Sequence, residues 1–161
     1  ITMRLAETPA LTAQYDDAQK TYAAFLEKFP ASRWTRNARF GLAFALENSG
    51  DSDGAITEYS KLLADKKKVD LWTVRSRFQV GECLFNLQKY DDAIAEFVNV
   101  EINYSKYPEW QAKAVLEMGR VLTAQGKKDQ ASERFKDVIR RYPKQKAATV
   151  AQQYLDELRN S

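Results

Sequence analysis

Three tryptophans place the strongest constraint on the fold, because they recur at one fixed spacing. Trp34, Trp72 and Trp110 lie 38 residues apart in both intervals. A period of this length is typical of stacked supersecondary units, each of which cannot bury its apolar face alone. The sequence therefore predicts a repeat architecture.

Other positions keep the same period. In each unit a large apolar residue and a small residue follow the tryptophan, and an alanine, an aromatic and an aliphatic residue follow later. In that order they are Phe40, Phe78 and Leu116; Ala43, Gly81 and Gly119; Ala55, Ala93 and Ala131; Tyr59, Phe97 and Phe135; Leu62, Val100 and Val138. One unit earlier, at a spacing of 37, the later half reads Tyr15, Ala18, Tyr22, Phe25 and Pro30.

The spacings within a unit predict two helices joined by a tight turn. Apolar residues recur at three and four, which is the period of a helix with one buried stripe. Polar breaks separate the two stripes, and Gly50 and Gly126 occupy the same place in their breaks, where a helix C-terminus favours positive φ. We expect the small residues to let the paired backbones approach closely, and the large ones to fill the space between units.

We expect helices at about 9–28, 33–48, 52–65, 70–87, 90–104, 108–125, 128–142 and 145–159. Thr8 before Pro9 is typical of an N-cap with proline at the first helical position. Asp70 is a second N-cap candidate. Tyr154 lies 38 residues after Leu116 among polar neighbours, which suits a terminal helix that covers the last repeat.

These residues resemble the tetratricopeptide repeat family. The order of small residue, polar turn, alanine, aromatic and proline is clearest in MGRVLTAQGKKDQASERFKDVIRRYP at 118–143, and the resemblance covers roughly residues 13–143. It implies an all-α fold, a right-handed superhelical solenoid of antiparallel helix pairs with about three and a half repeats and a C-terminal capping helix. The segments FLEKFPASRWTRNARF and VIRRYPKQKAATVAQQYL are similar to bacterial cell-envelope members, such as the periplasmic partner of the Tol–Pal system and a lipoprotein of the outer-membrane assembly machine.

The expected domain organisation follows from this pattern. Residues 1–8 are expected to be a linker or the tail of a preceding element, and residues 9–161 a single repeat domain. Its parts are a half repeat at 9–30, repeats at 31–68, 69–106 and 107–143, and the capping helix at 144–161. The chain begins at Ile1 without a charged leader, so we expect it to be a mature or excised part of a longer protein.

The residue inventory argues against an enzyme. The chain has no histidine, which is the commonest proton shuttle and metal ligand, and it shows no glycine-rich phosphate loop or nucleophile elbow. Cys83, the one cysteine, is expected to be a small buried hydrophobe, and Asp91 and Asp92 to favour the positive end of a helix. We therefore expect no catalytic residues, no metal and no cofactor.

Charge and hydropathy limit the classes of partner that we expect this chain to bind. A net charge of +3 is weak for a nucleic-acid binder, so both basic clusters are interpreted as solvated surface; they are Lys66, Lys67 and Lys68, and Lys136, Arg140, Arg141, Lys144 and Lys146. No apolar run approaches the roughly 18 residues of a membrane span, so no membrane insertion is expected. A protein or peptide partner remains, and self-association stays an alternative.

The tryptophans have two interpretations. They could anchor a ligand, since tryptophan is enriched at interface hot spots. Their equal spacing favours a structural role, in which each is wedged against the preceding unit, because a ligand rarely repeats with the period of the protein.

The resemblance implies where a partner binds. In the family, the first helix of each pair lines the concave side of the superhelix. The inward-facing positions of the family correspond here to Asn37, Phe40, Phe44, Asn48, Arg75, Phe78, Glu82, Phe85, Asn86, Lys113, Leu116 and Arg120. Phe40 and Phe78 could equally pack between units. This groove would be apolar at its centre, with Arg75, Lys113 and Arg120 towards one end, which suits an extended or helical peptide with apolar anchors and an acidic flank. It lacks the lysine and asparagine set with which some members hold a chaperone carboxylate, so docking of a chaperone tail is not expected.

The sequence is compatible with two functions. The first is a protein-interaction scaffold, an adaptor in bacterial cell-envelope maintenance or assembly, with the periplasm or envelope favoured and the cytoplasm left open. The second is a repeat segment of a larger chain that self-associates or docks within its own chain.

Overall fold

The computed structural model describes residues 9–161, with side chains described from Ala13 onwards. This part of the chain is all helical, in an order of eight α-helices. They are α1 (Pro9–Lys28), α2 (Thr35–Asn48), α3 (Ser52–Leu63), α4 (Leu71–Asn86), α5 (Tyr90–Asn103), α6 (Pro108–Ala124), α7 (Lys128–Arg141) and α8 (Lys146–Arg159). The ends predicted from the sequence agree with these bounds to within two residues, and the fold class is confirmed as a helical repeat solenoid.

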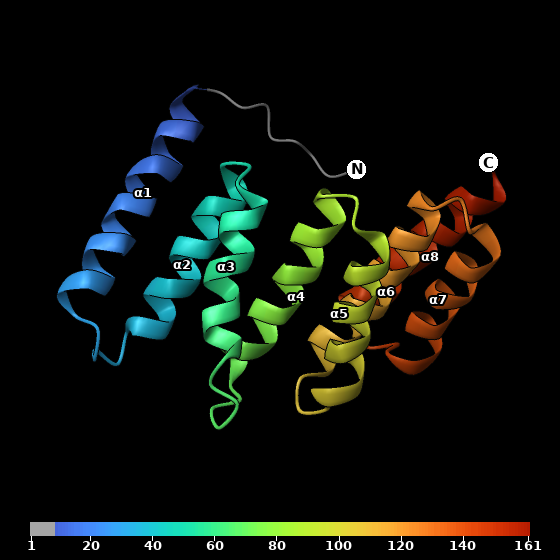
Figure 1. The fold of residues 1–161 in the computed structure, drawn as a ribbon. Coiled ribbons are helices and arrows are strands. Elements are labelled where there is room, and N and C mark those ends of the chain that lie inside the picture. Colours follow the sequence, from blue (N-terminus) through green and yellow to red (C-terminus); the bar gives the residue numbers. More distant parts are fainter. Residues whose placement is uncertain (1–8) are drawn as a thin grey trace.

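The helices stand side by side as a row of antiparallel pairs (Figure 1). Each helix packs against the next one along the chain. In addition, α2 contacts α4, α4 contacts α6, and α6 contacts α8. We call these four the inner helices, and we call α1, α3, α5 and α7 the outer helices. Each of α3, α5 and α7 therefore lies between two inner helices.

The periodic residues form the core, as the sequence predicts. Tyr59, Phe97 and Phe135 on the outer helices are almost completely buried. A Cβ added to Gly81 would lie 2.6 Å from the ring of Phe97, and one added to Gly119 would lie 2.4 Å from the ring of Phe135. In α4 and α6, the small residue is therefore the place where the aromatic ring of the following outer helix fits against the backbone.

The turns inside the pairs share one left-handed residue. Gly50 and Gly126 have φ values of +92° and +74°, which confirms the role predicted for these glycines. Gln88 holds the same position in the middle unit with φ of +59°, although it carries a side chain. The repeat geometry therefore imposes this conformation on a residue that adopts it at a cost.

The start of α4 confirms the N-cap predicted at Asp70, and the start of α5 confirms the place predicted for Asp91 and Asp92. The Asp70 carboxylate accepts a hydrogen bond from the Thr73 amide at 3.0 Å, and the Thr73 hydroxyl accepts one from the Asp70 amide, which completes a capping box at α4. Asp91 and Asp92 lie in the first turn of α5, at its positive end. The predicted cap at Thr8 lies outside the described residues.

The remaining structural expectations concern charge and Cys83. Cys83 is completely buried, as expected. The lysines of both basic clusters are exposed, and in the C-terminal one Lys136 pairs with Glu133 at 2.7 Å. Arg140 and Arg141 pair with Asp137 and Glu101. These side chains form solvated surface, consistent with the sequence interpretation.

Candidate functional site: the concave face of the inner helices

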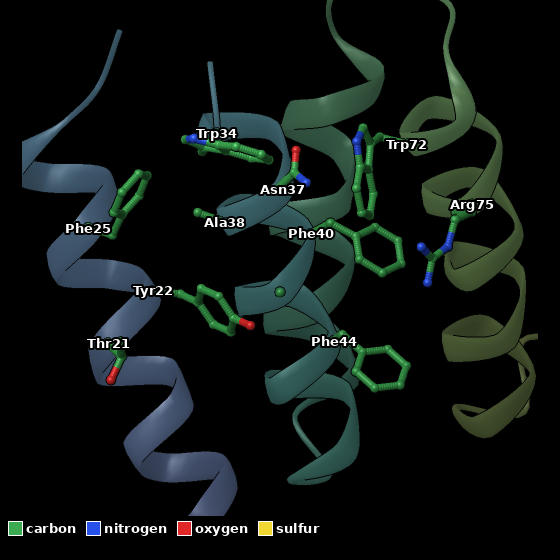
Figure 2. Close-up of a pocket in the computed structure, with 11 residues that line it drawn as sticks. Thr21, Tyr22, Phe25, Trp34, Asn37, Ala38, Phe40, Phe44, Trp72 and Arg75 are labelled. Carbon is green, nitrogen blue, oxygen red and sulfur yellow. The ribbon is translucent and has the colours of Figure 1, made fainter. Parts of the chain in front are cut away.

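A pocket lies in front of α2, between α1 and α4 (Figure 2). Its volume is about 530 Å³. Its lining is mostly apolar and aromatic; it consists of Thr21, Tyr22, Phe25, Trp34, Asn37, Ala38, Phe40, Gly41, Phe44, Trp72 and Arg75. Four residues predicted for the groove, Asn37, Phe40, Phe44 and Arg75, therefore line one pocket.

Phe40, Phe78 and Leu116 serve mainly as packing between units. Phe40 is only 6% exposed, and its ring lies 5.3 Å from that of Tyr59 and 5.2 Å from that of Trp72. Phe78 is buried in the same way, 5.4 Å from Phe97 and 5.2 Å from Trp110. Of the two roles that the sequence left open for Phe40 and Phe78, packing between units describes both, and only an edge of each ring is exposed. Leu116 is buried at the corresponding position of α6.

Phe44 and Phe85 are more accessible. Phe44 is 44% exposed on the inner face of α2, and its ring stacks at 6.3 Å on that of Phe40 (Figure 2). Phe85 is half-buried near the end of α4, 5.7 Å from Tyr90 and under the guanidinium of Arg120. An exposed aromatic ring supported from below by another ring is a suitable apolar contact for a partner.

Arg75 is positioned by aromatic rings. Its guanidinium lies 4.4 Å from the centre of the Phe40 ring, 5.1 Å from Trp72 and 6.0 Å from Trp110. Within residues 9–161 it forms no ion pair, whereas Lys113 pairs with Glu109 at 2.8 Å. Ring faces hold the guanidinium plane but leave its N–H donors unused, so Arg75 is able to receive an anionic group.

The other predicted polar residues differ in their surroundings. Asn48 is exposed and donates its side-chain amide to the Phe44 carbonyl at 2.7 Å, and Asn86 is exposed at the end of α4. Arg120 is half-buried and pairs with Glu117 at 2.5 Å. Asn48 and Asn86 are therefore exposed near the ends of α2 and α4, and the Arg120 guanidinium lies between Glu117 and the ring of Phe85.

Glu82 on α4 is a partly buried carboxyl group at one of the predicted groove positions. Oε1 of Glu82 is buried and has no hydrogen-bond partner among the described residues. Burial, together with the neighbouring Glu117 carboxylate, raises the pKa of Glu82 to about 9. Glu82 is therefore protonated at neutral pH.

A second partly buried carboxylate, Glu47, has hydrogen-bond partners. Glu47 accepts hydrogen bonds from the Tyr59 hydroxyl at 2.8 Å and from the Gln79 amide at 2.9 Å. Burial nevertheless raises its pKa, and burial also raises the pKa of the Cys83 thiol.

Among residues 9–161 no group of three or more candidate metal ligands comes together.

The tryptophan prediction holds for two positions and fails for one. Trp72 and Trp110 lie against Phe40 and Phe78 of the preceding inner helix, so they are wedged between units as expected. Trp34 is 52% exposed and lines the pocket, because α2 has no inner helix before it within the described chain. For Trp34 the structural interpretation is wrong.

The contribution of α1 to the pocket was missed from the sequence. Thr21, Tyr22 and Phe25 line it, together with Trp34, Ala38, Gly41 and Trp72, and none of these was predicted as a binding residue. The signal was present in the half repeat: an outer helix without its own inner helix leaves its aromatic residues uncovered.

The architecture and this surface define a class: a helical-repeat scaffold with a concave, aromatic face. The chain belongs to the tetratricopeptide repeat-like domain family, whose model matches residues 3–160. Members of this family generally bind proteins and are generally non-catalytic. No curated protein matches the chain.

Two solved structures share the fold. One is a tetratricopeptide repeat protein from Parabacteroides merdae, with a TM-score of 0.66 and 15% identity over 94% of this chain and 60% of that one. The other comes from a study titled as the functional characterisation of Pseudomonas aeruginosa pilF, with a TM-score of 0.63 and 19% identity over 90% of this chain and 69% of that one. This chain thus spans 60% of the length of the first structure. No helix in the described part is long and apolar enough to cross a membrane.

Proposed function

We propose that this chain is a non-catalytic scaffold that binds a partner protein through the concave face of its inner helices. The observation that carries the proposal is the pocket in front of α2, which contains both the exposed aromatic residue Phe44 and the guanidinium of Arg75, which forms no ion pair within residues 9–161. A mostly apolar concavity with a small number of oriented polar groups is the usual form of a binding site.

The chemistry of this face specifies the ligand. Phe44 and the aromatic lining of the pocket take apolar anchors from an extended or helical segment. Arg75 takes an acidic side chain next to those anchors, because its donors are oriented but unused in the described chain. The partner is thus a peptide segment with apolar anchors and an acidic flank.

The cellular role we infer is that of an adaptor in bacterial cell-envelope maintenance or assembly. The basis is the likeness of the segments around Trp34 and Tyr142 to envelope members of the family. A role in self-association or docking within a longer chain is the second candidate, and it is compatible with α1 contacting α2 alone within residues 9–161.

The proposal is tested by affinity capture from native lysate with the wild type and a Phe44→Asp/Phe85→Asp double variant. The control is Val69→Asp/Ile102→Asp, because these two exposed apolar residues lie outside the pocket. All proteins are first compared by circular dichroism and thermal melting. We expect a partner to be retained by the wild type and the control, and lost by the groove variant. A partner held equally by all three would place recognition elsewhere and contradict the site.

A further inference from the structure

The loops that join one helix pair to the next lie at one edge of the row, because successive helices alternate in direction (Figure 1). Taken with the first three residues of the helix that follows, the loops after α3, α5 and α7 are 64–73, 104–110 and 142–148. We call the surface of these three segments the loop edge. Units of a solenoid stack along the row, so further units before α1 or after α8 would leave the loop edge uncovered.

Lysines dominate the charge of the loop edge. Its three segments carry six basic residues and three acidic ones; they are Lys66, Lys67, Lys68, Lys106, Lys144 and Lys146, and Asp65, Asp70 and Glu109. All six lysines are exposed, and none forms an ion pair within residues 9–161. At the opposite edge the matching segments, 49–54, 87–92 and 125–130, carry three lysines and five aspartates. Positive charge is therefore concentrated at one edge of the molecule.

The acidic residues of the loop edge are engaged by contacts other than these lysine ammonium groups. Asp70 caps α4 and pairs with an arginine of α2 at 2.8 Å. The Asp65 carboxylate accepts a hydrogen bond from the Lys67 backbone amide at 3.1 Å, and Glu109 pairs with Lys113 at 2.8 Å. The six lysine ammonium groups are therefore free to bind anions from outside the chain.

Exposed aliphatic side chains lie among these lysines. Val69, directly after the three consecutive lysines, is 58% exposed, and Leu71 is exposed at the start of α4. Ile102 is 68% exposed in the last turn of α5, just before the second segment of the loop edge. In contrast, no large apolar residue is exposed in 49–54, 87–92 or 125–130 at the opposite edge. The same edge thus combines unpaired positive charge with apolar side chains in water.

We propose that the loop edge docks the protein on the surface of an anionic phospholipid bilayer. The lysines lie against the lipid phosphates, and Val69, Leu71 and Ile102 enter the boundary between the headgroups and the acyl chains. Docking of this kind needs no membrane-spanning helix. The inference goes beyond the proposed function, because it assigns a second surface, separate from the concave face.

The aliphatic residues favour a bilayer over a nucleic acid. A nucleic acid would use the lysines alone, and its bases would stack on exposed aromatic rings. At the loop edge, however, Tyr104 is buried, and Trp72 and Trp110 pack on phenylalanines of the inner helices. A bilayer uses both features, since it attracts the lysines and removes the exposed aliphatic side chains from water.

The test is sedimentation of the whole protein with vesicles of mixed phosphatidylglycerol and phosphatidylcholine, beside vesicles of phosphatidylcholine alone. We expect binding to the anionic vesicles only. Added salt should weaken this binding, because it screens the attraction between the lysines and the lipid phosphates.

Two variants separate the charged and the apolar contributions. Lys66→Gln/Lys67→Gln/Lys68→Gln should weaken binding to the anionic vesicles by at least about tenfold. Val69→Ser/Ile102→Ser keeps the net charge and should weaken binding by about threefold or more, because it removes the aliphatic contacts with the bilayer.

The matched control is Lys89→Gln/Lys127→Gln/Lys128→Gln, which removes the same charge from three exposed lysines of the opposite edge. It should bind the anionic vesicles nearly as the wild type does. Circular dichroism and thermal melting of all variants establish that each is folded.

An environment-sensitive fluorophore tests the orientation. Cys83 is completely buried, so a cysteine introduced by Ile102→Cys is the accessible site for the label. Anionic vesicles should shift the emission of this label to shorter wavelength. The same label at Gln130→Cys, an exposed position of the opposite edge, should keep its emission.

Other results would overturn the proposal. A wild-type protein that does not bind the anionic vesicles contradicts it directly. Equal losses in the two lysine variants would show adsorption by net charge alone. Tighter binding to a duplex oligonucleotide, unchanged in Val69→Ser/Ile102→Ser, would assign the edge to a nucleic acid. A label at the position of Ile102 that is already in apolar surroundings without vesicles would show that the protein itself covers the edge.

Discussion

The first two inner helices, α2 and α4, carry the same repeat pattern in different surroundings. Trp72 at the start of α4 lies against Phe40 of α2, but Trp34 at the start of α2 faces a pocket. Phe44 in α2 and Glu82 in α4 also occupy one repeat position. The ring of Phe44 is exposed, whereas one carboxyl oxygen of Glu82 is buried. The comparison of Trp72 with Trp34 shows that one repeat position becomes packed or exposed according to whether a preceding inner helix lies against it within the described chain.

The largest expected effect separates the two tryptophans. Trp72→Ala removes an indole that contacts Phe40 and supports Arg75, so the free energy of unfolding should fall by about 3–5 kcal/mol. Trp34→Ala removes an exposed ring and should cost less than about 1 kcal/mol. Urea denaturation followed by circular dichroism measures both. Equal losses would show that Trp34 is packed in solution, and the contrast between α2 and α4 would then be lost.

A smaller effect is expected at Glu82, and it depends on pH. Burial raises the pKa of this carboxyl in the folded protein to about 9, above its usual value near 4.5 in the unfolded chain. The folded state therefore holds a proton that the unfolded state releases, and the free energy of unfolding should fall as pH rises from about 5 to 9. Glu82→Gln should flatten this slope and stabilise the protein at pH 9 by about 1–3 kcal/mol.

The matched control for this slope is Glu109→Gln, which changes an exposed carboxylate paired with Lys113 at the surface. It should leave the dependence of stability on pH between 5 and 9 as it is in the wild type. A wild-type protein with constant stability over that range would contradict the buried, protonated state assigned to Glu82.

Much of the fold could be predicted because the same pattern of apolar and small residues recurs in three successive units. The period of the tryptophans, the small residues at Gly81 and Gly119 and the cap at Asp70 each correspond to one physical requirement, and each appears in the structure as expected. Gln88 could not be recognised as a left-handed residue, because its conformation is imposed by the geometry of the turn between α4 and α5.

The site was harder to predict than the fold. Four of the family positions line the pocket, but these positions did not include α1, and they could not separate buried Phe40 from exposed Phe44 without knowing the neighbouring helices. Tyr22 and Trp34 were assigned to packing because their counterparts are packed. Their exposure follows from the neighbours of α1 in space, and the repeat pattern does not contain that information.

Hydrogen exchange of the complex with the captured partner tests the central claim most directly. The account predicts that binding slows amide exchange in α2 and α4, whose inner faces line the pocket, and leaves α8 unchanged. Slower exchange in α8 or in the outer helices α5 and α7, with α2 and α4 unaffected, would contradict recognition by the concave face.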